Sequence, residues 1–270
     1  MGERSGLLEE LLRIAGEAAA VVLRGYAGEI RAEYKAVDDP VTAIDREANE
    51  LICGRLARAF PGVPIVAEES DPAGFVARDT ARECFFVDPL DGTREFIVRN
   101  GEFAVMIGLA SEGRATLGVV HAPARDRIFA GGEGVPSFEQ AKDGSRRLLA
   151  PSFVTAPSKA RALVSRSRVS AETLALLASL GVTVVEKMGG AGVKAMAVAS
   201  GEADVYLHLG LAGKLWDACA PEAIVVAAGG RYGDAWGRAA DYAHGPLDLA
   251  SGALVTATPE LFEAFVQARR

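Results

Sequence analysis

An apolar strand runs into a polar turn in the stretch Cys84-Phe85-Phe86-Val87-Asp88-Pro89-Leu90-Asp91-Gly92-Thr93. Pro89 has no N–H to donate to a sheet, so the strand is predicted to end near Asp88. In the turn, Asp88 and Asp91 can converge on one point, which the Leu90 carbonyl can also face. Such oxygen ligands suit a hard cation such as Mg²⁺, which leaves room for water and phosphate oxygens. An aspartate-rich turn without any ion has the same composition, so this stretch alone leaves both interpretations open.

The composition argues against several broad classes of protein. The chain has 270 residues, of which 50% are hydrophobic, and this suits one large domain or two tightly packed halves. Its formal charge of −7 argues against binding to a nucleic-acid polymer or an anionic membrane, but not against a small anion held through metal ions. We find neither a signal peptide nor an apolar run of about 20 residues. Three cysteines without metal-like spacing predict free thiols and a cytoplasmic location.

Periodicity in the first part of the chain predicts an α+β half, residues 1–136. Apolar residues at helical spacing predict a helix from Leu7 to Val22, and Thr42 is placed to cap a second helix with Asp45 in its first turn. A short strand is expected around residues 30–34, and residues 35–40 are predicted to form a polar loop. Strands are expected at residues 64–67, 84–88, 103–110, 115–121 and 127–130.

The remainder, residues 146–270, is predicted to be an α/β half because strands and helices alternate along it. The segment from Gly131 to Ser145 is rich in Gly, Ser and charge, and we interpret it as an exposed hairpin or loop between the halves. The two halves are expected to form one compact structural unit. Strands are expected at residues 162–165, 182–185 and 203–207, and helices at residues 171–180, 193–200 and 216–228.

Four motifs occur in an order typical of one known family. The Asp88 motif is preceded by Asp39-Pro40-Val41-Thr42-Ala43-Ile44-Asp45 and Ala67-Glu68-Glu69-Ser70, and it is followed by Trp216-Asp217-Ala218-Cys219-Ala220-Pro221-Glu222-Ala223. This set resembles the inositol monophosphatase superfamily of Mg²⁺-dependent, lithium-sensitive phosphatases, over nearly the whole chain. The resemblance implies an α/β fold of the sugar-phosphatase type, layered α-β-α-β-α.

The resemblance also implies roles for individual residues. Thr93 and Asp45 orient and deprotonate an attacking water, and Gly92 lets the phosphate approach the backbone beside the Thr93 hydroxyl. Two or three Mg²⁺ ions, or Mn²⁺, are the implied cofactor, and no covalent intermediate is required. The implied metal ligands are the carboxylates of Glu68, Asp88, Asp91 and Asp217 and the carbonyl of Leu90.

Three stretches favour the 3′(2′),5′-bisphosphate nucleotidase branch of that superfamily, which removes the 3′-phosphate of adenosine 3′,5′-bisphosphate. They are residues 89–97, residues 216–222 and the element Gly189-Gly190-Ala191-Gly192-Val193-Lys194. A Gly-rich helix start also suits a phosphate on physical grounds. Lys194, with Arg168 or His208, is expected to bind the phosphate that is not cleaved or the ribose.

Two positions depart from the patterns of relatives. Arg168 stands where the nucleotidase branch often has His, and Gly210 stands where inositol monophosphatases carry an acidic residue. The alternative functions are an inositol monophosphatase or inositol polyphosphate 1-phosphatase, and a non-catalytic binder of phosphorylated ligands. The expected partner is a small phosphorylated substrate, and the chain is expected to be a monomer or a homodimer.

Overall fold

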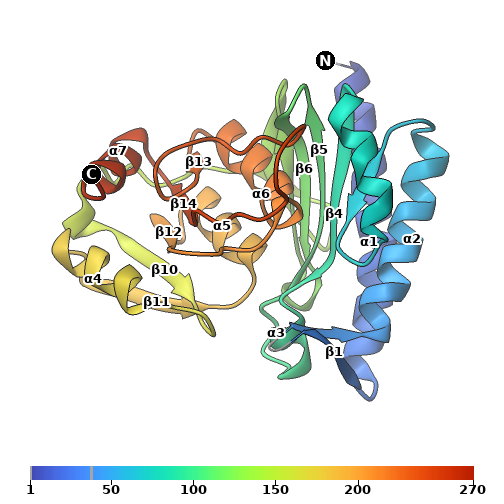
Figure 1. Cartoon of the computed structure of the whole chain (residues 1–270), viewed down its shortest axis with the longest axis horizontal. Helices are drawn as coiled ribbons and strands as arrows, with labels where there is room; N and C mark the ends of the chain where they lie inside the picture. Colours follow the sequence, from blue (N-terminus) through green and yellow to red (C-terminus); the bar gives the residue numbers. More distant parts are fainter. Residues whose placement is uncertain (1, 37–38) are drawn as a thin grey trace.

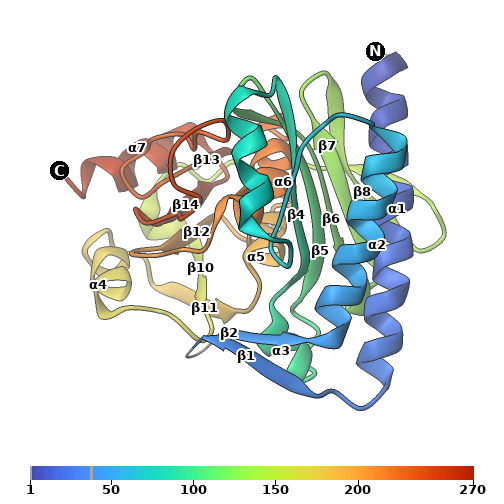
Figure 2. The same cartoon turned by 45° about the vertical axis from the view of Figure 1, so that its right-hand side comes forward.

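Helices and sheets alternate in layers across the molecule (Figure 1). The computed structural model describes residues 2–36 and 39–270. Helices α1 (Gly2–Ala27) and α2 (Ala43–Ala59) pack through their apolar faces on one side of a seven-stranded sheet, as Figure 2 also shows. The strand order is β3-β4-β5-β6-β7-β8-β9, with β3 and β4 parallel and the other neighbours antiparallel. The strands are β3 (Ile65–Ala67), β4 (Glu83–Asp91), β5 (Ala104–Ser111), β6 (Arg114–Ala122), β7 (Arg127–Gly132), β8 (Val135–Ala141) and β9 (Arg146–Leu148).

The other face of this sheet contacts α5 (Ala191–Ala199) and α6 (Leu215–Ala227), which separate it from a five-stranded sheet. The second sheet packs on its far side against α4 (Ala171–Ser179) and α7 (Pro259–Gln267). Its strand order is β11-β10-β12-β14-β13. The predicted α-β-α-β-α layering is therefore confirmed. The strands are β10 (Arg161–Ser165), β11 (Val184–Met188), β12 (Val205–His208), β13 (Arg231–Gly233) and β14 (Ala253–Thr256).

The sequence predicted that the strand ends near Asp88, because Pro89 cannot donate to a sheet, and this prediction is wrong. Strand β4 continues through Pro89 to Asp91, and its pairing with β5 shifts between Asp88, opposite Met106, and Asp91, opposite Ala104. One extra residue on β4 makes this a bulge, and a bulge is a place where a sheet tolerates proline. The bulge brings two carboxylates of one strand close together.

The loop predicted at residues 35–40 is largely a β-hairpin. Strands β1 (Ala32–Ala36) and β2 (Asp39–Thr42) pair antiparallel, and Val37 and Asp38 lie outside the described residues. Strands β8 and β9 also belong to the seven-stranded sheet, although β8 runs across the expected end of the first half at Pro136 and β9 lies beyond it. Residues 131–145 therefore form an integral hairpin of that sheet, whose Phe138 is buried in its core. The division of the chain into two halves at these residues stays a prediction.

Helix α6 lies directly on the seven-stranded sheet because two glycines leave room for it. A Cβ on Gly108 of β5 would lie 2.7 Å from the Ala220 nitrogen, and a Cβ on Gly118 of β6 would overlap the Ala220 carbonyl. This close approach carries Asp217, in the first turn of α6, to the end of β4. Within residues 2–36 and 39–270, no helix is long and apolar enough to cross a membrane.

Candidate metal centre

Three carboxylates meet at the point where β4 reaches α6. Oxygen atoms of Asp88, Asp91 and Asp217 all lie within 4.8 Å of one another, the first two from the β4 bulge and the third from the start of α6. The Leu90 N–H donates to Asp88 Oδ1 at 2.9 Å, and the Lys214 N–H donates to Asp217 Oδ2 at 2.7 Å. These backbone contacts fix both carboxylates in place.

Burial and mutual repulsion disfavour the charged forms of these carboxylates. Burial raises the pKa of Asp88 well above its ordinary value, and the neighbouring Glu68, Asp217 and Asp91 raise it further. Burial, followed by the charges of Asp91 and Glu68, raises the pKa of Asp217 to about 8. A cation among these oxygens removes the repulsion. The donor set, made only of carboxylate and carbonyl oxygens, fits Mg²⁺.

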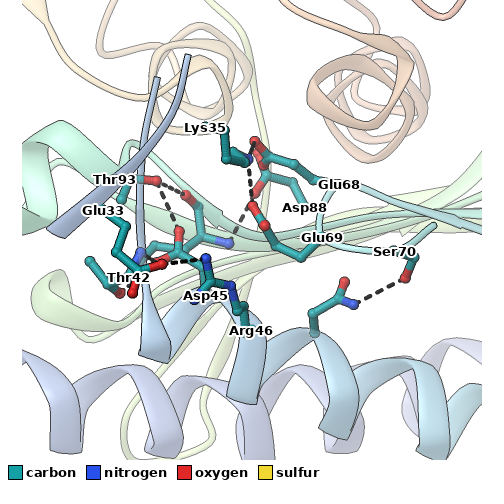
Figure 3. Close-up of polar contacts among 12 residues, drawn as sticks. Glu33, Lys35, Thr42, Asp45, Arg46, Glu68, Glu69, Ser70, Asp88 and Thr93 are labelled. Atoms are coloured by element: carbon teal, nitrogen blue, oxygen red, sulfur yellow. Dashed lines mark hydrogen bonds and ion pairs between the residues drawn. The ribbon is translucent and has the colours of Figure 1, made fainter. Parts of the chain in front are cut away.

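Glu68 lies beside Asp88 and contacts a lysine from the β1–β2 hairpin (Figure 3). The Lys35 ammonium lies 3.0 Å from Glu68 Oε1 and 2.6 Å from Glu69 Oε1. Although burial disfavours the Lys35 charge, these two carboxylates raise the pKa of Lys35 above its ordinary value. A cation of the protein itself therefore already neutralises this side of the cluster.

A hydroxyl–carboxylate pair adjoins the cluster. Thr93 Oγ1 lies 3.0 Å from Asp45 Oδ1 and 3.2 Å from the Leu90 carbonyl oxygen (Figure 3). Asp45 Oδ2 accepts the Thr42 N–H at 2.8 Å, so the predicted cap of α2 also orients this carboxylate. Burial raises the pKa of Asp45, and hydrogen bonds from Thr42 and Thr93 oppose that rise. The pair can accept a proton from a water bound beside Thr93.

Gly92 sets the direction of the chain between the carboxylates and Thr93. Its φ of +88° lies in the left-handed region, and a Cβ there would lie 2.9 Å from the Glu102 carbonyl oxygen. Thr93 begins the short helix α3 (Thr93–Ile97), so this glycine joins the end of β4 to that helix.

One pocket collects nearly all the residues predicted from the sequence, while Asp45 lies behind Thr93 and does not line it. The same pocket is also lined by Arg168 from the loop after β10, Lys194 from α5 and His208 from β12. Burial lowers the pKa of His208, and the nearby Arg168 and Lys194 lower it further, which favours a neutral imidazole. The predicted residues that line the pocket are Glu68, Asp88, Leu90, Asp91, Gly92, Thr93, Arg168, Lys194, His208 and Asp217.

Comparison with known proteins identifies the family to which this chain belongs. The sequence model described as "Inositol monophosphatase family" matches residues 4–270. The chain belongs to the inositol monophosphatase family. It is 34% identical over 238 residues to the 3′(2′),5′-bisphosphate nucleotidase CysQ of Escherichia coli K12, covering 87% of this chain and 94% of that protein. The 3′(2′),5′-bisphosphate nucleotidase CysQ of Salmonella typhimurium is 35% identical over 238 residues, covering 87% of this chain and 94% of that protein.

Solved structures of this family share the fold. The suhB protein of Bartonella henselae superimposes with a TM-score of 0.82 at 23% identity, covering 97% of this chain and 98% of that one. CysQ of Bacteroides thetaiotaomicron superimposes with a TM-score of 0.78 at 26% identity, covering 93% and 97% of the two chains. The family is one of metal-dependent phosphatases, and the cluster of Asp88, Asp91 and Asp217 is a candidate metal centre in this member.

Sequence reasoning missed two charged residues at this family site, Lys35 and Glu102. Glu102 is buried, and its carboxylate accepts the Gly189 N–H at 2.6 Å and forms two hydrogen bonds with Arg166, at 2.7 and 3.0 Å. Neither residue belongs to a chemical motif in the sequence. The contact of Lys35 with Glu68 depends on the β1–β2 hairpin, and the contact of Glu102 with Gly189 depends on the packing of the two parts of the chain, so neither contact can be inferred from the local sequence.

Proposed function

We propose that this chain removes the 3′-phosphate of adenosine 3′,5′-bisphosphate and releases AMP and phosphate. The observation that carries the proposal is one pocket that a carboxylate cluster and the Arg168 guanidinium line together, in a relative of CysQ nucleotidases. The carboxylates would hold Mg²⁺ beside the ester to be cleaved. Arg168 would bind the second phosphate of the substrate.

The metal ligands in this proposal are the four carboxylates together with the Leu90 carbonyl. Bound there, Mg²⁺ or Mn²⁺ supplies positive charge to the phosphate oxygens and lowers the pKa of a coordinated water. The Thr93 hydroxyl donates to Asp45, so the lone pairs of its oxygen are free to orient the attacking water. Asp45 then receives one proton of the water as the water oxygen bonds to phosphorus and the P–O bond to the 3′-oxygen breaks, and the 3′-oxygen takes a proton from solvent water to leave as the hydroxyl of AMP. The four proposed carboxylate ligands are Glu68, Asp88, Asp91 and Asp217.

Arg168 is the side chain best placed for the second phosphate. It is exposed and lines the pocket, and among residues 2–36 and 39–270 no carboxylate forms an ion pair with it. Its neighbour Arg166, by contrast, is bound to Glu102. An unpaired guanidinium can bind phosphate through two parallel hydrogen bonds. Gly210, in turn, offers no carboxylate to a polyol hydroxyl, which disfavours the inositol phosphate alternative.

A side-by-side substrate panel at fixed Mg²⁺ tests the proposed function. We expect kcat/KM for adenosine 3′,5′-bisphosphate to exceed that for inositol 1-phosphate and inositol 1,4-bisphosphate by at least about tenfold, or 1.4 kcal/mol. A preference for either inositol phosphate would replace the proposal with its first alternative. Absence of phosphate release from every compound would favour a non-catalytic binder.

The role of Arg168 is tested with the same panel. We expect Arg168→Ala to lower kcat/KM for the bisphosphate about tenfold or more, because one charge-assisted phosphate contact is lost. Hydrolysis of p-nitrophenyl phosphate, which has no second phosphate, should change less than about twofold. Arg58→Ala, which removes the same charge from an exposed position of α2, is the control. An equal loss for both substrates would exclude the proposed contact.

A further inference from the structure

The Gly-rich start of α5 binds a carboxylate of the protein itself. The Ala191 N–H donates to Asp91 Oδ1 at 2.9 Å, and the Gly192 N–H donates to Asp91 Oδ2 at 2.7 Å. These are the first two amide groups of the helix, which have no partner within a helix. Both oxygens of one carboxylate are therefore held by one helix end.

We propose that the N-terminus of α5 is a positioning element for Asp91, which holds the carboxylate oriented toward the metal centre. The inference rests on the proposed role of Asp91 as a metal ligand. It assigns the Gly189–Lys194 element to the protein's own carboxylate rather than to a substrate phosphate.

The geometry leaves Asp91 free to bind a cation. Each carboxylate oxygen accepts one N–H and has a second lone pair. Burial raises the pKa of Asp91, and the charge of Lys194 and the two backbone N–H donors oppose that rise. Such outer partners orient metal ligands and tune their affinity.

The glycines of this element are explained by the close contact with the first half of the chain. Gly190 has φ of +47°, and a Cβ there would lie 2.9 Å from Asp91 Oδ2. A Cβ on Gly189 would overlap the side chain of Glu95. Side chains at these positions would push α5 away from Asp91, so the requirement for glycine does not need a bound phosphate.

The buried side chain of Lys194 stabilises the turn at residues 188–190, which leads into α5. Its side chain is 3% exposed, and its ammonium donates to the carbonyls of Met188, Gly189 and Gly190. An ammonium has three protons, so these acceptors can use all of its donors. On the other side of the turn, Glu102 accepts the Gly189 N–H. Lys194 is thus a positioning residue for the turn that binds Asp91.

The decisive variant is Ala191→Pro, which removes one N–H that binds Asp91 and changes no side-chain charge. Ala191 is the first residue of α5, where a helix accepts proline. We expect the dissociation constant of Mn²⁺, measured by calorimetry on metal-free protein, to rise at least about tenfold, since a hydrogen bond to a charged group is lost. The matched control, Ala171→Pro at the first residue of α4, should leave it unchanged.

Two companion measurements separate the possible outcomes. If Asp91→Asn leaves Mn²⁺ binding intact, Asp91 is not a metal ligand and that part of the proposed function fails. If Asp91→Asn abolishes binding while a folded Ala191→Pro binds as the wild type does, the positioning role alone is wrong. Hydrogen exchange of the wild-type protein tests the two hydrogen bonds to Asp91 without any substitution. The Ala191 and Gly192 amides should stay protected with Mg²⁺ bound, and their deprotection would overturn the inference.

Lys194→Met distinguishes a positioning role from a substrate contact. We expect kcat/KM to fall by the same factor for adenosine 3′,5′-bisphosphate and for p-nitrophenyl phosphate, because the turn serves the metal centre common to both. The Ala191 amide should also exchange faster. A loss confined to the bisphosphate, with unchanged exchange, would restore Lys194 as a ligand of the second phosphate. Lys187→Met, on exposed β11, is the control.

Discussion

Thr93 is hydrogen-bonded to Asp45 and to the Leu90 carbonyl, and we propose that its hydroxyl links the candidate metal centre to Asp45 as proton acceptor. We expect Thr93→Ala to lower kcat at least about a hundredfold, the range typical of positioned proton transfer. KM should change less than about threefold, because the contact is needed mainly in the transition state. Steady-state kinetics with saturating Mg²⁺ measure both constants.

Thr93→Ser is the matched control for that prediction, since it keeps the hydroxyl. Most of the activity should return in this variant. A rise in KM at unchanged kcat in Thr93→Ala would instead make Thr93 a binding residue only.

Single residues were predictable where they carry a local chemical signal. Asp88 and Asp91 follow an apolar strand, and their spacing already suggested a common ligand. Glu68 follows a predicted strand and could join the cluster as the end of a neighbouring strand, whereas Asp217 could be added only through family resemblance, because nothing local joins it to β4. Lys35 and Glu102 could not be found, because each acts through residues distant in the sequence, Glu68 and Gly189.

At the scale of elements, α6 is fixed to the loop after β13 by a buried carboxyl group. The Tyr242 hydroxyl donates to Glu222 Oε2 at 2.6 Å. Burial raises the pKa of Glu222 to about 7 despite this bond. The pKa of Glu222 is therefore higher in the folded than in the unfolded chain. The neutral Glu222 carboxyl group contributes fully to the free energy of unfolding below about pH 4.5, and this contribution is lost as the pH rises to about 7.

Glu222→Gln should remove this pH dependence, because the amide imitates the neutral acid. We expect the variant to be more stable than the wild type above pH 7, by up to about 3 kcal/mol, and nearly equal to it below pH 4.5. Urea unfolding in EDTA between pH 4.5 and 8 measures the difference. Glu263→Gln, on the exposed side of α7, is the control. A constant difference across this range would show that Glu222 does not titrate as described.

Element types were more predictable than element ends. Helical periodicity and the Thr42 cap indicated α1 and α2 correctly, because both signals are local. The predicted end of β4 was wrong because a β-bulge can contain proline. Whether a bulge forms depends on the pairing with the partner strand, which the sequence of β4 alone does not show. The strand expected at residues 30–34 corresponds to β1, but β2 and its pairing with β1 were missed, because the polar residues of β2 carry no alternating pattern.

For the whole molecule, the metal centre joins β4 of the first sheet to α6 of the second part of the chain. Ions that bind there stabilise only the folded state. We expect Mg²⁺ at about 100 times its dissociation constant to raise Tm by roughly 5–10 °C over EDTA, from about 2.7 kcal/mol of linkage. Phosphatase activity should disappear in EDTA and return with Mg²⁺ or Mn²⁺.

Differential scanning calorimetry with and without Mg²⁺ measures that shift. Asp88→Asn should show a much smaller one, because a central oxygen ligand is replaced by an amide. Full activity in excess EDTA, or an equal Tm shift in Asp88→Asn, would contradict the metal centre.

The glycine-lined contact between α6 and the seven-stranded sheet has a consequence for protein synthesis. A ribosome completes that sheet with Leu148, but α6 follows only with Leu215–Ala227. Until then, the nascent sheet lacks the helix that covers Gly108 and Gly118, and Asp88 and Asp91 lack Asp217. The three carboxylates of the candidate metal centre can therefore come together only after Asp217 has been synthesised. A ribosome that stalls between these points holds an inactive chain with an apolar face open to chaperones and to aggregation.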